Sequence, residues 1–249
     1  MMKKALYNHA SYIKQGKKMK LTTLSLAAAL AVNTAFAGGD FVDTVEPVVE
    51  TPVVEESALE ISANLAITSN YVWRGMTQSS KSPAVQGGID LGYNGFYLGA
   101  WGSNVEFKDG SNNNLEADIY AGYAAEIAGI GYDIGFIQYA YPNDSDALNF
   151  EEAYIGLSKD FGAFGVNGKY SFGLDDAPDY WDLGASAALP MDSTLAFTYG
   201  DYDTYGTNYI VSLAKEFGKF EISVAYTDFE AEVGPYTEDH IVGTISTSF

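Results

Sequence analysis

The sequence predicts an all-β protein, an antiparallel transmembrane β-barrel of about twelve strands. Three observations predict this class. Apolar and polar side chains alternate with a period of two from residue 59 onward. Tight and longer connections alternate between these runs. Aromatic residues reach 14% and charged residues only 18%, and no stretch has the roughly 18 consecutive apolar residues that a spanning helix needs.

Residues 19–37 predict a cleaved export signal. Lys20 supplies the basic start, residues 21–32 form a mostly apolar core, and Ala35-Phe36-Ala37 is an A-x-A cleavage site. The apolar core is too short to span a membrane as a helix. We therefore expect the mature chain to begin at Gly38.

The start of this signal is open to two interpretations. Met19 alone begins a complete signal peptide. Residues 1–18 are therefore either a misassigned start or an extension of the basic region, and in the second case the signal peptide spans residues 1–37.

Residues 38–58 predict a flexible acidic linker in the periplasm. They are rich in acidic residues and contain Pro47 and Pro52, which a central strand would not accept. A short edge strand beginning at Val53 is the alternative. We expect the barrel to occupy residues 59–249.

The charge of the mature chain excludes several classes of protein. After residue 37 the chain keeps 7 basic and 33 acidic residues, a net charge of −26. Such a charge repels phosphate, which argues against nucleic-acid binding. The chain has no Cys, so it has neither a disulfide framework nor a Cys-based zinc site.

The first predicted strand, residues 59–73, alternates between apolar odd and mostly polar even positions. It is longer than the five or six residues of an average soluble strand and suits the about 9–11 residues that cross a bilayer at a tilt. The same alternation predicts eleven more strands, at 84–93, 96–106, 115–127, 130–141, 150–160, 164–173, 180–189, 193–201, 206–216, 220–229 and 238–249.

The connections between these strands favour an outer-membrane barrel. Those at 94–95, 128–129, 161–163, 190–192 and 217–219 are tight. Those at 74–83, 107–114, 142–149, 174–179, 202–205 and 230–237 are mostly longer and rich in Asp, Asn, Ser, Gly and Pro. Short turns on one side and longer loops on the other are typical of such barrels, and an even strand count places both termini at the short turns.

Aromatic residues predict two belts at the membrane interfaces. Beside the tight turns lie Tyr93, Phe96, Phe161, Phe164, Phe217, Phe220 and Phe249. Near the opposite strand ends lie Tyr71, Trp73, Phe172, Trp181, Tyr199 and Phe229. A soluble β-sandwich or a lipocalin-like barrel, with ordinary core aromatics, is the alternative.

Residues 69–107 resemble the TorF family of outer-membrane porins. The resemblance rests on the runs Ser69-Asn70-Tyr71-Val72-Trp73-Arg74-Gly75, Gln78-Ser79, Pro83-Ala84-Val85-Gln86-Gly87-Gly88 and Gly99-Ala100-Trp101-Gly102-Ser103-Asn104. Residues 116–123 fit the same pattern, and the resemblance covers about residues 59–249. It implies an outer-membrane barrel with a channel function.

The polar face of the strands predicts an acidic pore lining. Its acids are Glu60, Asp90, Glu116, Asp118, Glu126, Asp133, Glu152, Asp182 and Glu221. Lys169 and Arg74 are the candidate cations on this face, and Arg74 is equally suited to a structural ion pair. An acid-rich wall concentrates cations and repels anions. The alternative is that these acids pair with the two cations and fill a narrow lumen, because twelve strands lie between the filled eight-stranded and the open 16–18-stranded barrels.

Enzymatic and metal-dependent activities have little support. His240 is the one histidine of the mature chain, and no nucleophile motif accompanies it. The loop acids Asp144, Asp146, Asp175, Asp176, Asp179, Asp201 and Asp203 could offer oxygen ligands, but they lack a cation-binding pattern and suit turn chemistry. We expect no catalysis, no cofactor and no metal site.

These observations predict a porin-like channel in the outer membrane of a Gram-negative bacterium, through which small hydrophilic solutes diffuse passively, with cations preferred. The partners would be outer-membrane lipid, lipopolysaccharide and the solutes or ions themselves. Lys81 and Lys108 lie in predicted outer loops, where they either meet lipopolysaccharide phosphates or are simply solvated. The alternative function is a non-conducting structural or surface-binding barrel. The solute and the oligomeric state stay open.

Overall fold

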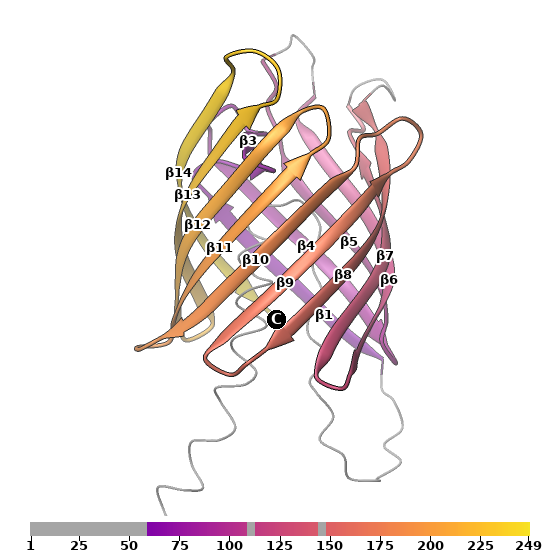
Figure 1. Ribbon diagram of the computed structural model, residues 1–249, viewed down its shortest axis with the longest axis vertical. Helices are drawn as coiled ribbons and strands as arrows, with labels where there is room; N and C mark the ends of the chain where they lie inside the picture. Colours follow the sequence, from indigo (N-terminus) through magenta and orange to yellow (C-terminus); the bar gives the residue numbers. More distant parts are fainter. Residues whose placement is uncertain (1–58, 109–112, 144–147) are drawn as a thin grey trace, which may run out of the picture.

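A computed structural model describes residues 59–108, 113–143 and 148–249, which form one closed barrel (Figure 1). Twelve antiparallel strands enclose the lumen, which confirms the predicted fold class and strand count. The predicted signal peptide and linker, residues 1–58, lie outside the described residues.

The strands lie close to their predicted positions. They are β1 (Glu60–Thr68), β4 (Ala84–Tyr93), β5 (Phe96–Asn104), β6 (Leu115–Ile127), β7 (Ile130–Ala140), β8 (Phe150–Asp160), β9 (Phe164–Gly173), β10 (Tyr180–Leu189), β11 (Ser193–Tyr202), β12 (Gly206–Phe217), β13 (Phe220–Ala231) and β14 (Thr237–Ser248). The prediction of a first strand over residues 59–73 is wrong at its end, because β1 stops at Thr68.

The sheet closes by pairing its first strand with its last. Leu65 lies opposite Gly87 of β4 on one side and opposite Thr247 of β14 on the other. Beyond this register, the backbone amide of Phe249 donates to the Ala63 carbonyl at 2.9 Å, and the Ala63 amide donates to the Phe249 carbonyl at 3.2 Å. A closed sheet of this kind has no unpaired edge, which is the condition for a sheet in hydrocarbon.

The two faces of the barrel differ as the alternation predicts. Leu65, Ile119 and Leu183 point outward and are 46%, 57% and 58% exposed. Their inward neighbours are polar and buried, such as Asp118 beside Ile119 and Asp182 beside Leu183. A continuous exposed apolar surface of this kind is typical of contact with lipid rather than water. No helix of the described segments is both long and apolar enough to cross a membrane.

Two of the tight turns have two consecutive positive φ angles, with glycine at the second position. At Asn94-Gly95 the φ angles are 53° and 82°, and at Ala128-Gly129 they are 54° and 72°. Two consecutive positive φ angles define the type I′ hairpin turn, which matches the strand twist. Figure 1 shows these turns at the same end of the barrel as the C-terminus, as the even strand count predicts.

One aromatic belt is confirmed and the other is partly wrong. The seven aromatic residues beside the tight turns are all at least half exposed. At the opposite end Phe172 and Tyr199 are exposed, and Trp181 is partly buried with the outward parity of β10. Tyr71 and Phe229, however, are buried, and Trp73 is partly buried. Phe229 has the inward parity of β13, and the other two belong to a segment that leaves the wall.

That segment, residues 69–83, is called the inserted segment here because it turns into the lumen instead of forming an outer loop. It contains a small hairpin of β2 (Val72–Trp73) and β3 (Met76–Thr77), separate from the barrel sheet. Figure 1 shows β3 inside the ring of strands, toward the end with the longer loops. The prediction of residues 74–83 as an outer connection is therefore wrong.

A type I′-like turn explains why this hairpin forms. Arg74 and Gly75 connect its strands with φ angles of 47° and 82°, and Trp73 lies opposite Met76. The hairpin carries Tyr71 and Val72, whose side chains are 1% and 0% exposed. Burial of these apolar groups stabilises the inward conformation over a solvated loop.

The inserted segment reaches both sides of the lumen. On one side Tyr71 packs its ring edge-on against Trp101 of β5, with ring centroids 5.6 Å apart. On the other side Val72 belongs to a buried apolar cluster with residues of β11 to β14, namely Ala196, Ile210, Ala214, Ala225 and Val242. The segment therefore crosses the lumen and narrows it.

We predict that an arginine on the outer face destabilises the barrel according to its depth. Leu183→Arg, near the middle of β10, should lower the free energy of unfolding in lipid by about 2–4 kcal/mol. The matched control is Leu189→Arg, on the same face at the end of β10, which should cost about 0–1 kcal/mol. Equal costs at the two positions, measured by reversible unfolding in vesicles, would contradict a lipid-facing outer surface.

We also predict that Gly75 is needed for the inserted segment to pack against the wall. A Cβ at Gly75 would lie 2.8 Å from Asn208 Cβ and 2.9 Å from Phe229 Cβ. Gly75→Ala should therefore cost about 1–3 kcal/mol more than backbone strain alone.

Gly234→Ala measures that strain by itself, since Gly234 also has a positive φ of 91° but nothing lies within 4 Å of its added Cβ. Unfolding free energies of the two variants are compared in the same vesicles. Equal losses would mean that the segment does not pack tightly on β12 and β13.

Candidate functional site

The lumen is the candidate functional site, because the inward positions of the strands carry polar side chains. A strand alternates its side chains between two faces, so the polar set of each strand points to the same interior. The buried polar wall residues are Thr68, Gln86, Asp90, Ser103, Glu116, Asp118, Glu152, Ser171, Asp182, Ser186, Thr194, Thr198, Asn208, Ser212, Ser223, Thr227, His240 and Thr244.

The structure brings most of the predicted pore-lining residues to this interior. The buried ones are Arg74, Asp90, Glu116, Asp118, Glu152 and Asp182. Asp133, Lys169 and Glu221 are partly buried, whereas Glu126 and Glu60 are exposed, Glu126 near the tight-turn end of β6 and Glu60 at the start of β1. The predicted set therefore divides into a buried group, mostly in the half of the barrel with the longer loops, and a less buried group, mostly toward the tight turns.

Arg74 forms an ion pair at the centre of the site. Its Nη2 lies 2.7 Å from Glu152 Oε2, and the two side chains are 4% and 1% exposed. Burial alone would lower the pKa of the guanidinium, but the Glu152 carboxylate and neighbouring tyrosines raise it, and the net shift of the Arg74 pKa is upward. Arg74 is thus a permanent cation, placed in the lumen by the inserted segment and not by a barrel strand.

Three aromatic rings surround this guanidinium. Its Cζ lies 4.1 Å from the ring centroid of Trp73, 4.1 Å from that of Tyr180 and 4.6 Å from that of Tyr202. Distances below about 6 Å allow cation–π attraction, which is stronger in a site shielded from water. Tyr180 and Tyr202 belong to the barrel wall, whereas Trp73 belongs to the inserted segment.

The other lumen carboxylates have different partners. The Tyr71 hydroxyl donates to Glu116 Oε1 at 3.1 Å, and the Tyr97 hydroxyl donates to Asp133 Oδ1 at 2.8 Å. Neither Glu116 nor its strand neighbour Asp118 has a basic side chain at ion-pair distance among the described residues. Glu116 and Asp118 are therefore two buried carboxyl groups of β6 with no cation of the described residues beside them.

Two more predicted acids have a partner in the wall. Asp90 accepts a hydrogen bond from the Tyr120 hydroxyl. Asp182 lies opposite Lys169 in the pairing of β10 with β9. The charge of Asp182 is therefore set against a cation, unlike the charges of β6.

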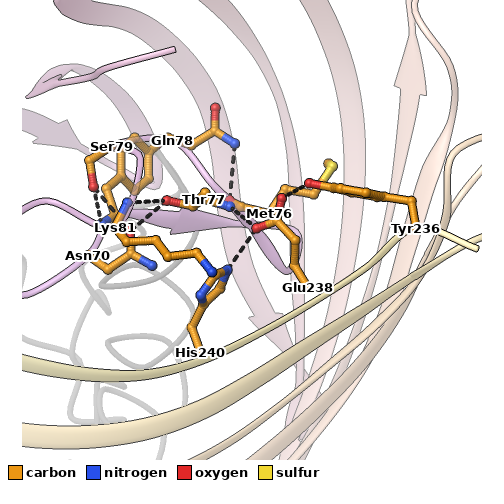
Figure 2. A network of polar contacts seen from close by, with 10 residues as sticks. Asn70, Met76, Thr77, Gln78, Ser79, Lys81, Tyr236, Glu238 and His240 are labelled. Carbon is orange, nitrogen blue, oxygen red and sulfur yellow. Dashed lines mark hydrogen bonds and ion pairs between the residues drawn. The ribbon is translucent and has the colours of Figure 1, made fainter. Parts of the chain in front are cut away.

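A polar network holds the inserted segment against β14 (Figure 2). The Thr77 amide donates to Glu238 Oε2 at 3.0 Å, and the Thr77 hydroxyl donates to Asn70 Oδ1 at 2.6 Å. Ser79 Oγ also donates to Asn70 Oδ1, at 3.1 Å. Glu238 belongs to β14, so this network ties the segment to the last strand.

His240 is part of the same network. Its Nε2 lies 2.7 Å from Glu238 Oε2, and Figure 2 shows both side chains facing the inserted segment. Among the described residues the partner of His240 is thus a carboxylate and not a Ser or Thr hydroxyl. The contact positions the segment and lacks the nucleophile that a hydrolase needs.

The part of the chain that the structure describes has no group of side chains placed to bind a metal ion. Residues 59–108, 113–143 and 148–249 contain no cluster of three or more His, Cys, Asp or Glu side chains suited to a metal. Asp144 and Asp146, two of the loop acids considered above, lie outside the described residues.

Sequence reasoning missed the inserted segment and everything that depends on it. It identified Arg74 and Glu152 separately but could not pair them, because they are 78 positions apart. It also missed Tyr180 and Tyr202 as lumen residues. One local signal existed: Arg74-Gly75 follows the apolar run Tyr71-Val72-Trp73 and offers the glycine that a two-residue hairpin turn needs.

The fold is similar to that of solved porins. The KdgM porin matches with a TM-score of 0.55 at 10% identity, over 76% of this chain and 98% of that chain. The KdgM porin in complex with disordered oligogalacturonate matches with a TM-score of 0.53 at 10% identity, over 77% and 98%. The NanC porin matches with a TM-score of 0.53 at 13% identity, over 76% and 99%. At these identities the likeness establishes the barrel fold.

Sequence comparison gives the family. No curated protein matches this chain. The TorF resemblance of residues 69–107 is not named by the family comparison and stays a prediction. A family model matches nearly the whole barrel and the end of the linker before it, and so the chain belongs to the family described as "Bacterial protein of unknown function (Gcw_chp)", over residues 53–248.

Proposed function

We propose that the chain is a porin-like channel of the outer membrane of a Gram-negative bacterium, through which small hydrophilic solutes diffuse passively. One observation carries this proposal: a closed sheet exposes apolar side chains outward and encloses polar side chains. Such a distribution is stable only with lipid outside and a polar interior. The fold shared with porins and the TorF resemblance support the same function.

We propose further that the channel prefers cations. Arg74 offsets Glu152, and Lys169 lies opposite Asp182. Glu116 and Asp118 have no such counter-charge among the described residues. Fixed carboxylates of this kind attract cations into a pore.

The lumen charges also argue against an acidic solute. One of the similar porins is in complex with disordered oligogalacturonate, a polyanion. A polyanion would be repelled by a lumen wall in which acidic side chains outnumber basic ones among the described residues. The proposed solutes are therefore neutral or cationic.

The inserted segment favours a second candidate function, a non-conducting structural or surface-binding barrel. The segment contacts the wall from β5 to β14 and leaves a narrow lumen. A barrel of twelve strands lies between the filled eight-stranded and the open 16-stranded barrels, so an inserted segment can close much of its interior. We therefore expect single-channel conductance well below that of open 16-stranded porins.

No enzymatic role is proposed, because no Ser or Thr hydroxyl is hydrogen-bonded to His240 among the described residues. The partners that we propose are outer-membrane lipid and lipopolysaccharide around the barrel and small solutes or ions within it. Lys81 and Lys108 are both exposed, but Lys81 belongs to the inserted segment and not to the outer loop predicted for it. Lys108 is therefore the better candidate for contact with a lipopolysaccharide phosphate.

We predict that the reversal potential in a salt gradient lies on the cation side and moves toward zero in the double variant Glu116→Gln with Asp118→Asn. These changes remove charge with little change of size, and the new amide at the first position keeps an acceptor oxygen for the Tyr71 hydroxyl. The preference should weaken with salt, since the Debye length falls from about 10 Å at 0.1 M to about 3 Å at 1 M. Planar-bilayer recordings of the purified protein measure both effects.

The matched control removes two exposed loop acids, Asp203→Asn with Glu232→Gln, and should leave the reversal potential unchanged. An anion-selective parent, or equal shifts in the two double variants, would contradict the role of β6. No conductance in the parent would favour the non-conducting barrel.

We predict that the protein extracted from outer membranes begins at Gly38. N-terminal sequencing after membrane fractionation tests this, and Ala37→Leu should block cleavage because the site needs small residues. A soluble chain, or a membrane chain that keeps residues 19–37, would contradict the predicted signal and location.

A further inference from the structure

We propose that the lumen wall carries a binding site for a guanidinium or alkylammonium group, formed by Glu152, Tyr180 and Tyr202, and that Arg74 is its resident occupant. A cationic solute would bind there by displacing the Arg74 side chain. This displacement rests on the proposed channel function, whereas the site itself rests on the wall residues alone.

The wall groups supply the two elements of an organic-cation site. Glu152 of β8 gives a buried carboxylate, and Tyr180 of β10 and Tyr202 of β11 give ring faces within 4.6 Å of the bound Cζ. Carboxylate and aromatic faces together recognise guanidinium and ammonium groups through charge and cation–π attraction. The site is therefore suited to organic cations more than to a hard metal ion, which prefers several oxygen ligands.

The barrel holds these groups in place without the inserted segment. Tyr180 lies opposite Tyr202 in the pairing of β10 with β11, and their rings meet edge-on at a centroid distance of 6.0 Å. The Tyr180 ring crosses Gly200, where a Cβ would lie 2.1 Å from the tyrosine oxygen. Because only a glycine leaves room for this orientation, the ring position is fixed by the wall. The site should persist when Arg74 leaves it.

The occupant can leave without the whole segment moving. The inserted segment is held on one side by the Tyr71 contact to Glu116 and on the other by the Thr77 contact to Glu238. Neither contact involves Arg74. Rotation of one long side chain would free the cage, while these two anchors keep the hairpin in the lumen.

The Arg74 side chain is tethered to the inserted segment, and this tether sets the concentration at which a free solute can compete with it for the site. A side chain on a short tether acts at an effective concentration of about millimolar or above. A free guanidinium compound of equal intrinsic affinity must approach that concentration to displace Arg74. Removal of the tethered group should therefore strengthen binding of the free compound at least about tenfold.

The test measures, by calorimetry, whether methylguanidinium binds saturably to the purified full-length protein in detergent. Arg74→Ala should bind it at a half-saturating concentration at least about tenfold below that of the parent. The double variant Arg74→Ala with Glu152→Gln should lose most of this binding. Urea, a neutral molecule of similar shape, and NaCl at equal ionic strength are the ligand controls.

Three outcomes overturn the proposal: no saturable binding to Arg74→Ala, equal binding to the double variant, or equal binding of urea. If Arg74→Ala does not fold, refolding is repeated with methylguanidinium; recovery of the folded barrel supports the site and failure to recover overturns it. None of these measurements depends on conductance. A barrel that binds methylguanidinium but does not conduct would support the site and contradict the channel. A barrel that conducts but does not bind methylguanidinium would support the channel and contradict the site.

Discussion

Pairing of every strand backbone is the constraint on which the remaining structure depends. A sheet that spans hydrocarbon has no water to satisfy an open edge, so β1 must meet β14. The register that joins Leu65 to Thr247 achieves this. Once the sheet is closed, parity decides everything else: each outward residue faces lipid and each inward residue shares one confined lumen.

Twelve strands make that lumen too wide to be filled by small side chains and too narrow for a wide aqueous pore. The inserted segment resolves this conflict by adding a hairpin to the interior. Its apolar members pack against both sides of the wall, as Tyr71 does with Trp101. Its polar members form hydrogen bonds to the wall, as Thr77 does with Glu238.

Most of the fold could be predicted from sequence because period-two alternation is a local property that needs no partner. Eleven strand positions and the tight turns followed from it. The inserted segment could not be predicted in this way, since Tyr71 and Trp73 continue the alternation of β1 while the chain leaves the wall at Thr68. Phe229 was misplaced for a different reason: aromatic residues suit both an interface belt and a filled lumen, and only its parity separates the two.

The buried pair of Arg74 and Glu152 shows how the site and the segment depend on each other. A buried ion pair contributes little net stability because desolvation offsets much of its attraction. Removal of one partner, however, leaves an uncompensated buried charge, which costs about 3–5 kcal/mol. As a carboxylate, Glu152 is therefore strongly stabilised by a cation beside it. In the present structure the chain supplies that cation itself, so any change that removes Arg74 leaves a wall with a strong demand for another positive group.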